Sequence, residues 1–340
     1  MARNLILAIG DGWPHGAVKL VSELRTHVPN GCATAQNTMF ESADAEVDRL
    51  ISELRCTNIS LWVTYHNYYK APDLLGPRVS AALGVPYVII EASRAKSRLT
   101  GPWARFAAAS EAACNAADVI YYVIELDAFA LKRDRMDAQS LIHLRPFLPT
   151  DQLPAETKRH PGQILTVGMF RGRDKLGSYR IIAETLTHLR GDHWHLSIAG
   201  DGPARADVEA LMAPFHDRVT FLGQLDRSAL DTVYQQASVF LWPGYNEAYG
   251  LVYLEAQAAG VPAVAQERSG VRDVVLPANY PSPDDGPAAL AQMLQTLLDD
   301  PVAACTQGQM ARENVAEHHL IGPARNTFWQ AAQPLIERHK

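Results

Sequence analysis

Short runs of apolar residues alternate with longer amphipathic stretches along most of the chain. The apolar runs are continuous, which is typical of parallel strands buried on both faces, and the stretches between them, such as 179–190, have helical spacing. The segment 26–58 has a weaker pattern, in which we expect a strand near 33–39. Elsewhere the alternation predicts parallel β/α units, with strands at 4–9, 61–64, 87–90, 119–124, 164–168, 195–200, 219–223, 238–242 and 262–265.

A proline-rich stretch, 144–163, interrupts this alternation. It has little periodicity, and the strand and helix pattern begins again at residue 164. Such a stretch is typical of a linker between two domains. The sequence therefore predicts an α/β protein with two Rossmann-like, doubly wound domains and a C-terminal helix that packs back toward the first domain. The expected ranges are 1–155, 156–320 and 321–340.

Composition and charge narrow the class of protein. The 340 residues are 47% hydrophobic and 20% charged, as in a globular protein. No apolar run is long enough to span a bilayer, and the N-terminal run is too short for a secretory signal. The net charge of −6 argues against a nucleic-acid binder. The four cysteines lie far apart without metal-ligand spacing, so we expect a cytoplasmic protein of undetermined oligomeric state.

Two glutamates, Glu247 and Glu255, interrupt the apolar pattern of 242–265. We expect a strand, a loop and then a helix closed by Gly260. The free amides and dipole of such a helix favour a phosphate. About eight residues at 1.5 Å each would separate the glutamates by about 12 Å, comparable to the span of a nucleotide sugar. Glu255 would then bind ribose hydroxyls and Glu247 the sugar. The amides expected to face the phosphate are those of Tyr249, Gly250 and Leu251.

Either glutamate alone is also typical of a solvated helix or of a helix start favoured by the dipole. The surrounding motifs make the pair more specific, because four of them follow one another in the order of a known family. They are ILTVGMFRGRDKLGSYRIIAETL, HLSIAGDGPAR, VTFLGQLDRSALDTVYQQASVFLWP and NEAYGLVYLEAQAAGVPAVA. The region 164–275 thus resembles the nucleotide-sugar domain of retaining GT-B glycosyltransferases, close to family 4 (glycosyl transferases group 1), and 61–93 resembles their acceptor-side domain.

This resemblance implies two Rossmann-like domains that face a central cleft. It implies transfer of a sugar, with retained configuration and without a metal or other cofactor, from a nucleotide diphosphate donor. UDP-sugars are the commonest donors, and GDP- or ADP-sugars are open. The acceptor hydroxyl would belong to a lipid, a polysaccharide or a small molecule, as in the synthesis of cell-envelope polysaccharides or glycolipids.

An arginine and a lysine after the first strand of the second domain stabilise the departing diphosphate in this family. The resemblance assigns these roles to Arg171 and Lys175, next to the donor-binding Gly168. The family usually has arginine directly after the glycine, where this sequence has Met169. Arg173 is therefore the alternative to Arg171.

In the first domain, the family's glycine-containing loop corresponds to Gly12 and Gly16, which we expect near the donor phosphates. His66 directly follows a predicted strand, so it would position the acceptor, contact the donor sugar or be structural. Many relatives have a second histidine where this sequence has Glu91. That carboxylate would take the acceptor's proton, bind a polar or cationic acceptor group, or cap a helix. In the same-face mechanism the leaving phosphate takes the proton, and Glu91 is then not essential.

The segment 94–106 contains four cations together with Leu99, Trp103 and Phe106. It predicts peripheral contact with the inner face of the membrane, an ordinary basic helix face, or a site for an anionic acceptor. The acidic pairs 284–285 and 299–300 are interpreted as loop and helix-end charges rather than metal ligands.

Three other functions stay open. A GT-B sugar-nucleotide epimerase would act on the same donor, whereas a phosphorylase-like enzyme would need a lysine-bound pyridoxal cofactor. The third is a non-catalytic sugar-nucleotide-binding protein with a degenerate donor site. The stretch LPANYPSPDDG lacks the glycine-rich turn that relatives often have, which bears on the edge of the donor pocket more than on the chemistry.

Overall fold

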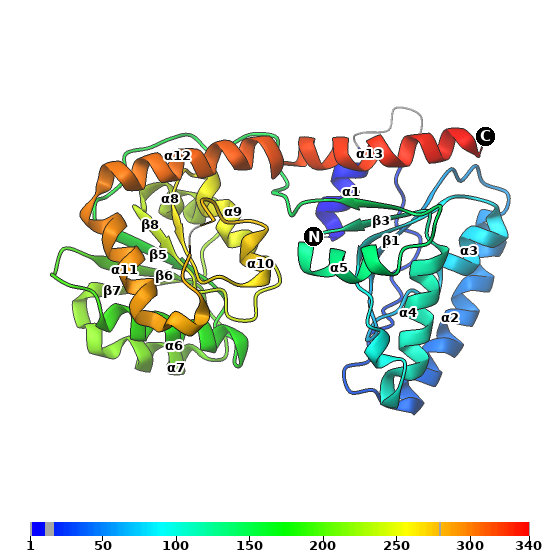
Figure 1. Cartoon of the computed structure of the whole chain (residues 1–340), viewed down its shortest axis with the longest axis horizontal. Coiled ribbons are helices and arrows are strands. Elements are labelled where there is room, and N and C mark those ends of the chain that lie inside the picture. The colour runs from blue at the N-terminus through cyan, green and yellow to red at the C-terminus, as the bar shows by residue number, and fades with distance from the viewer. Residues whose placement is uncertain (1, 11–16, 279, 340) are drawn as a thin grey trace. The chain divides into compact units, whose positions relative to one another are not determined.

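In the computed structural model, the chain folds into two compact units (Figure 1). Unit 1 comprises Met1–Arg145 and Gly322–Lys340, and unit 2 comprises Pro146–Ile321. No helix in the described part of the chain combines the length and apolar character needed to cross a membrane. The residues that the structure describes are 2–10, 17–278 and 280–339.

Unit 1 is built on a parallel sheet with the strand order β1-β2-β3-β4. Ile120 and Tyr122 of β3 belong to a core shared with helices on one face of this sheet. Tyr121 points to the other face, where its ring stacks on Phe328 of the C-terminal helix at 5.0 Å. Both faces are therefore covered by helices, as in a doubly wound fold. The strands are β1 (Trp62–Asn67), β2 (Tyr87–Ala92), β3 (Val119–Tyr122) and β4 (Ser140–His143). The helices are α1 (Ala2–Gly10), α2 (Ala33–Leu54), α3 (Gly76–Leu83), α4 (Ala104–Ala116), α5 (Glu125–Arg133) and α13 (Ile321–Arg338).

Two strands predicted in this unit are wrong, because the segments are helices. Residues 4–9 lie in α1, and a short apolar run cannot by itself distinguish a buried strand from a buried helix. Residues 33–39 begin α2, which buries Val47 and Leu50 at helical spacing. Strand β4 was not predicted, because its four residues are exposed or only half-buried.

Unit 2 contains a five-stranded parallel sheet with the order β7-β6-β5-β8-β9. Each of its strands overlaps one of those predicted from the apolar runs. The order in the sheet reverses between β5 and β8, so the carboxyl ends of these two strands meet at a topological switch point. Ligands of open α/β sheets bind at such a point. The strands are β5 (Gln163–Val167), β6 (His195–Ala199), β7 (Val219–Gly223), β8 (Val239–Leu241) and β9 (Ala263–Val264).

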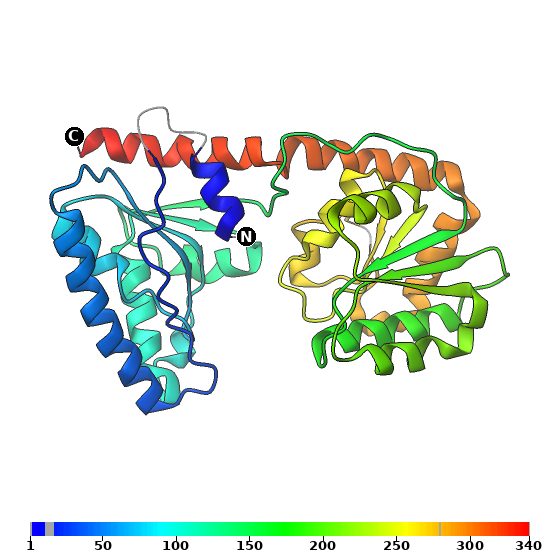
Figure 2. The ribbon, with the colours of Figure 1, turned by 180° about the vertical axis from the view of Figure 1, so that it is seen from behind.

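A large hydrophobic core lies within this second unit. Figure 2 shows α6 and α7 on one face of the sheet and α8 and α9 on the other. Near the switch point, the rings of Tyr179 and Trp242 meet edge to face at 5.4 Å, and both side chains are fully buried. The helices are α6 (Asp174–Thr187), α7 (Arg205–Met212), α8 (Arg227–Gln236), α9 (Leu251–Ala258), α10 (Ser269–Arg272), α11 (Gly286–Asp299) and α12 (Pro301–His318).

Candidate functional site

The segments that follow β5 and β8 bring Lys175 and Glu247 together at the switch point. Lys175 Nζ lies 2.5 Å from Glu247 Oε2. Trp242, directly after β8, donates from Nε1 to the same oxygen at 3.1 Å, and its ring centre is 5.2 Å from the ammonium group. The side chains of Lys175 and Glu247 are 23% and 16% exposed. The structure therefore places a half-buried cation and carboxylate, oriented by an indole, where a ligand is expected.

The start of α9 supplies backbone amides beside this pair. The helix begins at Leu251, and Gly250 is its N-cap in a left-handed conformation with φ 63° and ψ 84°. No side chain of a described residue caps the first turn, which leaves its amides available to an anion. A Cβ atom at Gly250 would lie 2.8 Å from the Tyr253 ring and 3.0 Å from Glu247 Cγ. Glycine is therefore required here both by conformation and by space.

The predicted 12 Å separation of the glutamates was derived wrongly. The interval from Glu247 to Gly250 is loop, and only the part from Leu251 onward is helical. The rise of a helix therefore applies to about half of the interval. Tyr249 and Leu251 are both half-buried next to Gly250.

Glu255 is bound by two residues that the sequence did not reveal. Its Oε1 accepts a hydrogen bond from Arg227 Nη1 at 2.8 Å, and its Oε2 accepts one from the Tyr234 hydroxyl at 3.0 Å. Burial, reinforced by the charge of Glu255, raises the pKa of Tyr234 and keeps it a donor. Each carboxylate oxygen still has a second lone pair for a ligand hydroxyl. Asp226 accepts a hydrogen bond from Ala229 N and caps α8. The sequence around Arg227 is therefore typical of an ordinary helix start and does not indicate a binding residue.

Arg268 is a third residue that sequence reasoning missed. Its guanidinium lies 5.2 Å from the centre of the Tyr245 ring, and its Nη2 donates to Gln266 Oε1 at 2.7 Å. Its Nε is buried and has no hydrogen-bond partner in the part of the chain that the structure describes. Burial lowers its pKa. The only sequence signal was its place after β9, at the carboxyl edge of the sheet.

The two arginines predicted to contact a diphosphate lie at the surface. Arg171 and Arg173 precede α6, and both are exposed. Arg173 has a positive φ of 59°. Gly168, just after β5, packs tightly instead, because a Cβ atom there would lie 2.8 Å from the Trp242 ring. Its carbonyl accepts a hydrogen bond from the Tyr179 hydroxyl at 2.8 Å.

In unit 1 the structure brings His66 and Glu91 together. They stand at the carboxyl ends of the adjacent strands β1 and β2, with His66 Nδ1 3.6 Å from Glu91 Oε1. Both have a positive φ, 77° and 63°, which is rare for residues other than glycine. Gly12 and Gly16, predicted to approach the donor, lie outside the described residues.

The predicted basic and aromatic surface at 94–106 is wrong for three of its residues. Arg94 is buried and pairs with Glu111 at 2.7 Å. Phe106 is fully buried and Trp103 is 8% exposed. These side chains therefore contribute to the interior of unit 1 rather than to a surface that meets lipid.

One member of each acidic pair binds backbone amides at a helix start. Asp285 accepts a hydrogen bond from Ser282 N, and Asp300 accepts from Val302 N and Ala303 N at the start of α12. Across residues 2–10, 17–278 and 280–339, no three His, Cys, Asp or Glu side chains are grouped as ligands of a metal ion.

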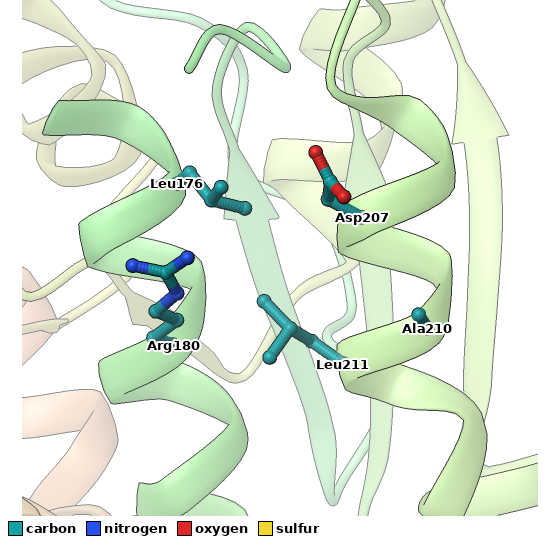
Figure 3. Close-up of a pocket in the computed structure, with 5 residues that line it drawn as sticks. All are labelled: Leu176, Arg180, Asp207, Ala210 and Leu211. Carbon is teal, nitrogen blue, oxygen red and sulfur yellow. The ribbon is translucent and has the colours of Figure 1, made fainter. Parts of the chain in front are cut away.

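A cavity of about 240 Å³ lies between α6 and α7. Figure 3 shows that Leu176 and Arg180 of α6 line one side of it, opposite the residues of α7. None of its lining residues belongs to the groups around Lys175 or Glu255. The α7 residues are Asp207, Ala210 and Leu211.

Comparison with known proteins identifies a region that contains both Lys175 and Glu247. Residues 161–300 match the family model of the glycosyl transferases group 1. The chain is 27% identical over 288 residues to alpha-D-kanosaminyltransferase from Streptomyces kanamyceticus, covering 75% of this chain and 70% of that protein. It is 34% identical over 136 residues to 2-deoxystreptamine glucosyltransferase from the same organism, covering 37% of this chain but only 35% of that protein.

A solved structure resembles the whole fold. Sucrose-phosphate synthase from Thermosynechococcus elongatus matches with a TM-score of 0.65 over 95% of this chain and 83% of that one. The sequences are 22% identical, so this likeness concerns the fold alone. The predicted resemblance to the GT-B glycosyl transferases group 1 and the predicted α/β fold class are confirmed, and retention of configuration stays a prediction.

Proposed function

We propose that this chain, which has the GT-B fold and is a member of the glycosyl transferases group 1 through residues 161–300, transfers a sugar from a nucleotide diphosphate donor to an acceptor hydroxyl. The observation that carries the proposal is the Lys175–Glu247 pair at the switch point of unit 2, beside the uncapped start of α9.

The donor would change the partners of this pair. The diphosphate binds the amides at the start of α9 and the Lys175 ammonium. Lys175 then exchanges the Glu247 carboxylate for a phosphate oxygen. Glu247 keeps the hydrogen bond from Trp242 and accepts hydroxyls of the sugar. Glu255, oriented by Arg227 and Tyr234, accepts the ribose hydroxyls.

In the reaction, the bond from the anomeric carbon to the phosphate oxygen breaks as the bond to the acceptor oxygen forms. Negative charge grows on the departing diphosphate, and Lys175 with the α9 amides stabilises it. Arg171, Arg173 and Arg268 are further cations that would reach this charge. The acceptor proton leaves with the diphosphate. We infer retention of configuration, a UDP-sugar donor, and no need for a metal ion or other cofactor.

A thermal-shift experiment tests the donor site, because a ligand that binds only the folded state stabilises it. We expect one of UDP, GDP and ADP to stabilise the protein. Lys175→Ala and Glu255→Ala should lose this stabilisation. Lys158→Ala, which removes an exposed lysine of the same unit, should keep it. If no nucleotide stabilises the wild-type protein, the donor site is degenerate and the proposal fails.

Product analysis distinguishes the transferase from an epimerase. We expect nucleotide release from the stabilising donor to depend on an acceptor, to proceed in EDTA, and to give a product with the donor's anomeric configuration. Release without acceptor, together with an epimerised sugar, would instead support the epimerase. Release that stops in EDTA and returns with Mg²⁺ would contradict metal independence.

A further inference from the structure

The pair of His66 and Glu91 leaves one carboxylate oxygen without a partner. Glu91 Oε1 faces His66 Nδ1 at 3.6 Å, which is longer than a hydrogen bond. Glu91 Oε2 is buried and has no hydrogen-bond partner among the residues that the structure describes. A buried carboxylate oxygen without a donor is unfavourable. The position therefore fits a group that receives its donor from a ligand.

The backbone at this position is also strained. The register of β1 and β2 pairs Tyr65 with Ile90 and Asn67 with Ala92, on either side of His66 and Glu91. Between these regular pairs, both residues adopt a positive φ. Such conformations persist where the surrounding structure holds them, and they cluster at sites that bind ligands.

Among the residues that the structure describes, Glu91 forms no ion pair with the buried arginine three residues later. Arg94 is already paired with Glu111 at 2.7 Å, and its side chain is 1% exposed. The ion-pair contact that the structure shows for Glu91 is with His66, whose side chain is 40% exposed. The Glu91 side chain itself is 19% exposed, so its carboxylate is a half-buried acceptor beside a more exposed imidazole.

A row of aromatic rings continues from this pair to the buried Trp103. The His66 ring meets the edge of Tyr68 at 4.8 Å, Tyr68 meets Tyr69 at 5.8 Å, and Tyr69 meets Trp103 at 5.4 Å. Faces of aromatic rings pack against the apolar face of a ring-shaped ligand and attract cations. At the far end of this row, Lys70 and Arg98 lie over Tyr69. A cationic group would therefore bind at the Glu91 end.

We propose that His66, Glu91 and Tyr68 bind the amino group and adjacent ring face of an amine-bearing sugar or cyclitol acceptor. This inference rests on the proposed sugar transfer and names the class of its acceptor. An ammonium group has three donors and a full positive charge, so it satisfies the carboxylate and compensates it. A hydroxyl has one donor and no charge. Rotation about the last torsion of Glu91, which is broad in energy, turns the second oxygen toward the ligand.

Matched acceptor pairs test this proposal with the full chain and the donor that stabilises it. The pairs are glucosamine against glucose and scyllo-inosamine against scyllo-inositol, which differ by one amino group. Binding is followed by saturation-transfer NMR and transfer by nucleotide release. We expect the amino member of at least one pair to bind and to react with a kcat/KM at least tenfold higher than its neutral partner.

Glu91→Gln keeps the shape of the side chain and removes its charge. We expect it to raise KM for the amino acceptor at least tenfold and to abolish the preference over the neutral partner, with kcat little changed. Glu41→Gln, the same change at an exposed position of α2, should behave as wild type. Donor-induced thermal stabilisation should be the same in all three proteins.

Three results would overturn the inference. The first is that the neutral member of each pair reacts as well as the amino member. The second is that Glu91→Gln lowers kcat equally for both members, which would indicate a role in proton transfer. The third is that no member of either pair binds. In each case, donor-induced stabilisation of the wild type would show that the donor site still stands. Its loss would instead contradict the proposed function itself.

Discussion

Replacing Gly250 by alanine tests whether the start of α9 holds Glu247 in place. Gly250 has φ 63°, where an alanine costs about 1–2 kcal/mol. The added Cβ would also lie 2.8 Å from the Tyr253 ring and 3.0 Å from Glu247 Cγ. Tyr253 is fully buried, and its hydroxyl donates to the Trp242 carbonyl at 2.8 Å. Glu247 is therefore the neighbour that must move.

Displacement of Glu247 should weaken the donor sugar's contacts. A hydrogen bond to a charged group contributes about 1.5–3 kcal/mol, which corresponds to about a 10- to 100-fold increase in Kd. We expect Gly250→Ala to lose about 1 kcal/mol or more of unfolding free energy and to bind the nucleotide sugar at least tenfold more weakly. Urea unfolding and isothermal titration calorimetry measure the two quantities.

Gly84→Ala is the matched control, because it shares the backbone conformation without the contact. Gly84 has φ 66° and ψ 35°, and a Cβ atom there would meet no atom of the described residues within 4 Å. We expect it to lose about 1 kcal/mol and to bind donor as wild type. Wild-type donor affinity in Gly250→Ala, or an equal loss of affinity in Gly84→Ala, would refute the reasoning.

Three further predictions concern charge and ionisation. Arg227→Gln should change the unfolding free energy by less than about 1 kcal/mol, because the arginine is 60% exposed. It should nevertheless weaken nucleotide binding in titration calorimetry, because Glu255 loses the arginine that orients it. Unchanged affinity would contradict this. Burial raises the pKa of the Cys114 thiol to about 12, so native protein should react with a thiol reagent at its three exposed cysteines and at the fourth only in denaturant. Hydrogen bonds from Arg49 and then Ser22 lower the pKa of Glu46 from 4.5 to about 2. The stability that the ionised carboxylate adds is therefore present above pH 4.5 and is lost as the pH falls through 2. In urea unfolding, the loss of stability caused by Glu46→Gln should shrink over that range, and a pH-independent difference would contradict the ion pair.

The sequence predicted the second unit better than the first, for physical reasons. The strands β5, β8 and β9 are buried along most of their length, so their segments are continuous apolar runs such as 164–168. The run at 4–9 has the same character but forms α1, because burial alone does not determine backbone conformation. Strand β4 is half-exposed and leaves no apolar run.

The residues of the candidate site that directly follow strands could be predicted from the sequence. The contacts between residues that are distant in the sequence could not. Lys175 and the loop with Glu247 follow the ends of two strands. Because the sheet is parallel, these ends meet at one edge, so the two residues were expected to lie close together. Arg227 meets Glu255 across 28 positions of the chain, and Arg268 stacks on Tyr245 from another loop. No spacing rule encodes such contacts.

The course of the chain has a consequence for protein synthesis. Unit 1 takes its last helix from α13, whose Phe328 stacks on Tyr121 and accepts its hydroxyl hydrogen bond at 2.7 Å. All of unit 2, through Ile321, is translated before that helix. The unit that begins first on the ribosome therefore finishes last. The face of its sheet that carries Tyr121 lacks the cover of α13 while the second unit folds, and exposed apolar surface of this kind favours aggregation.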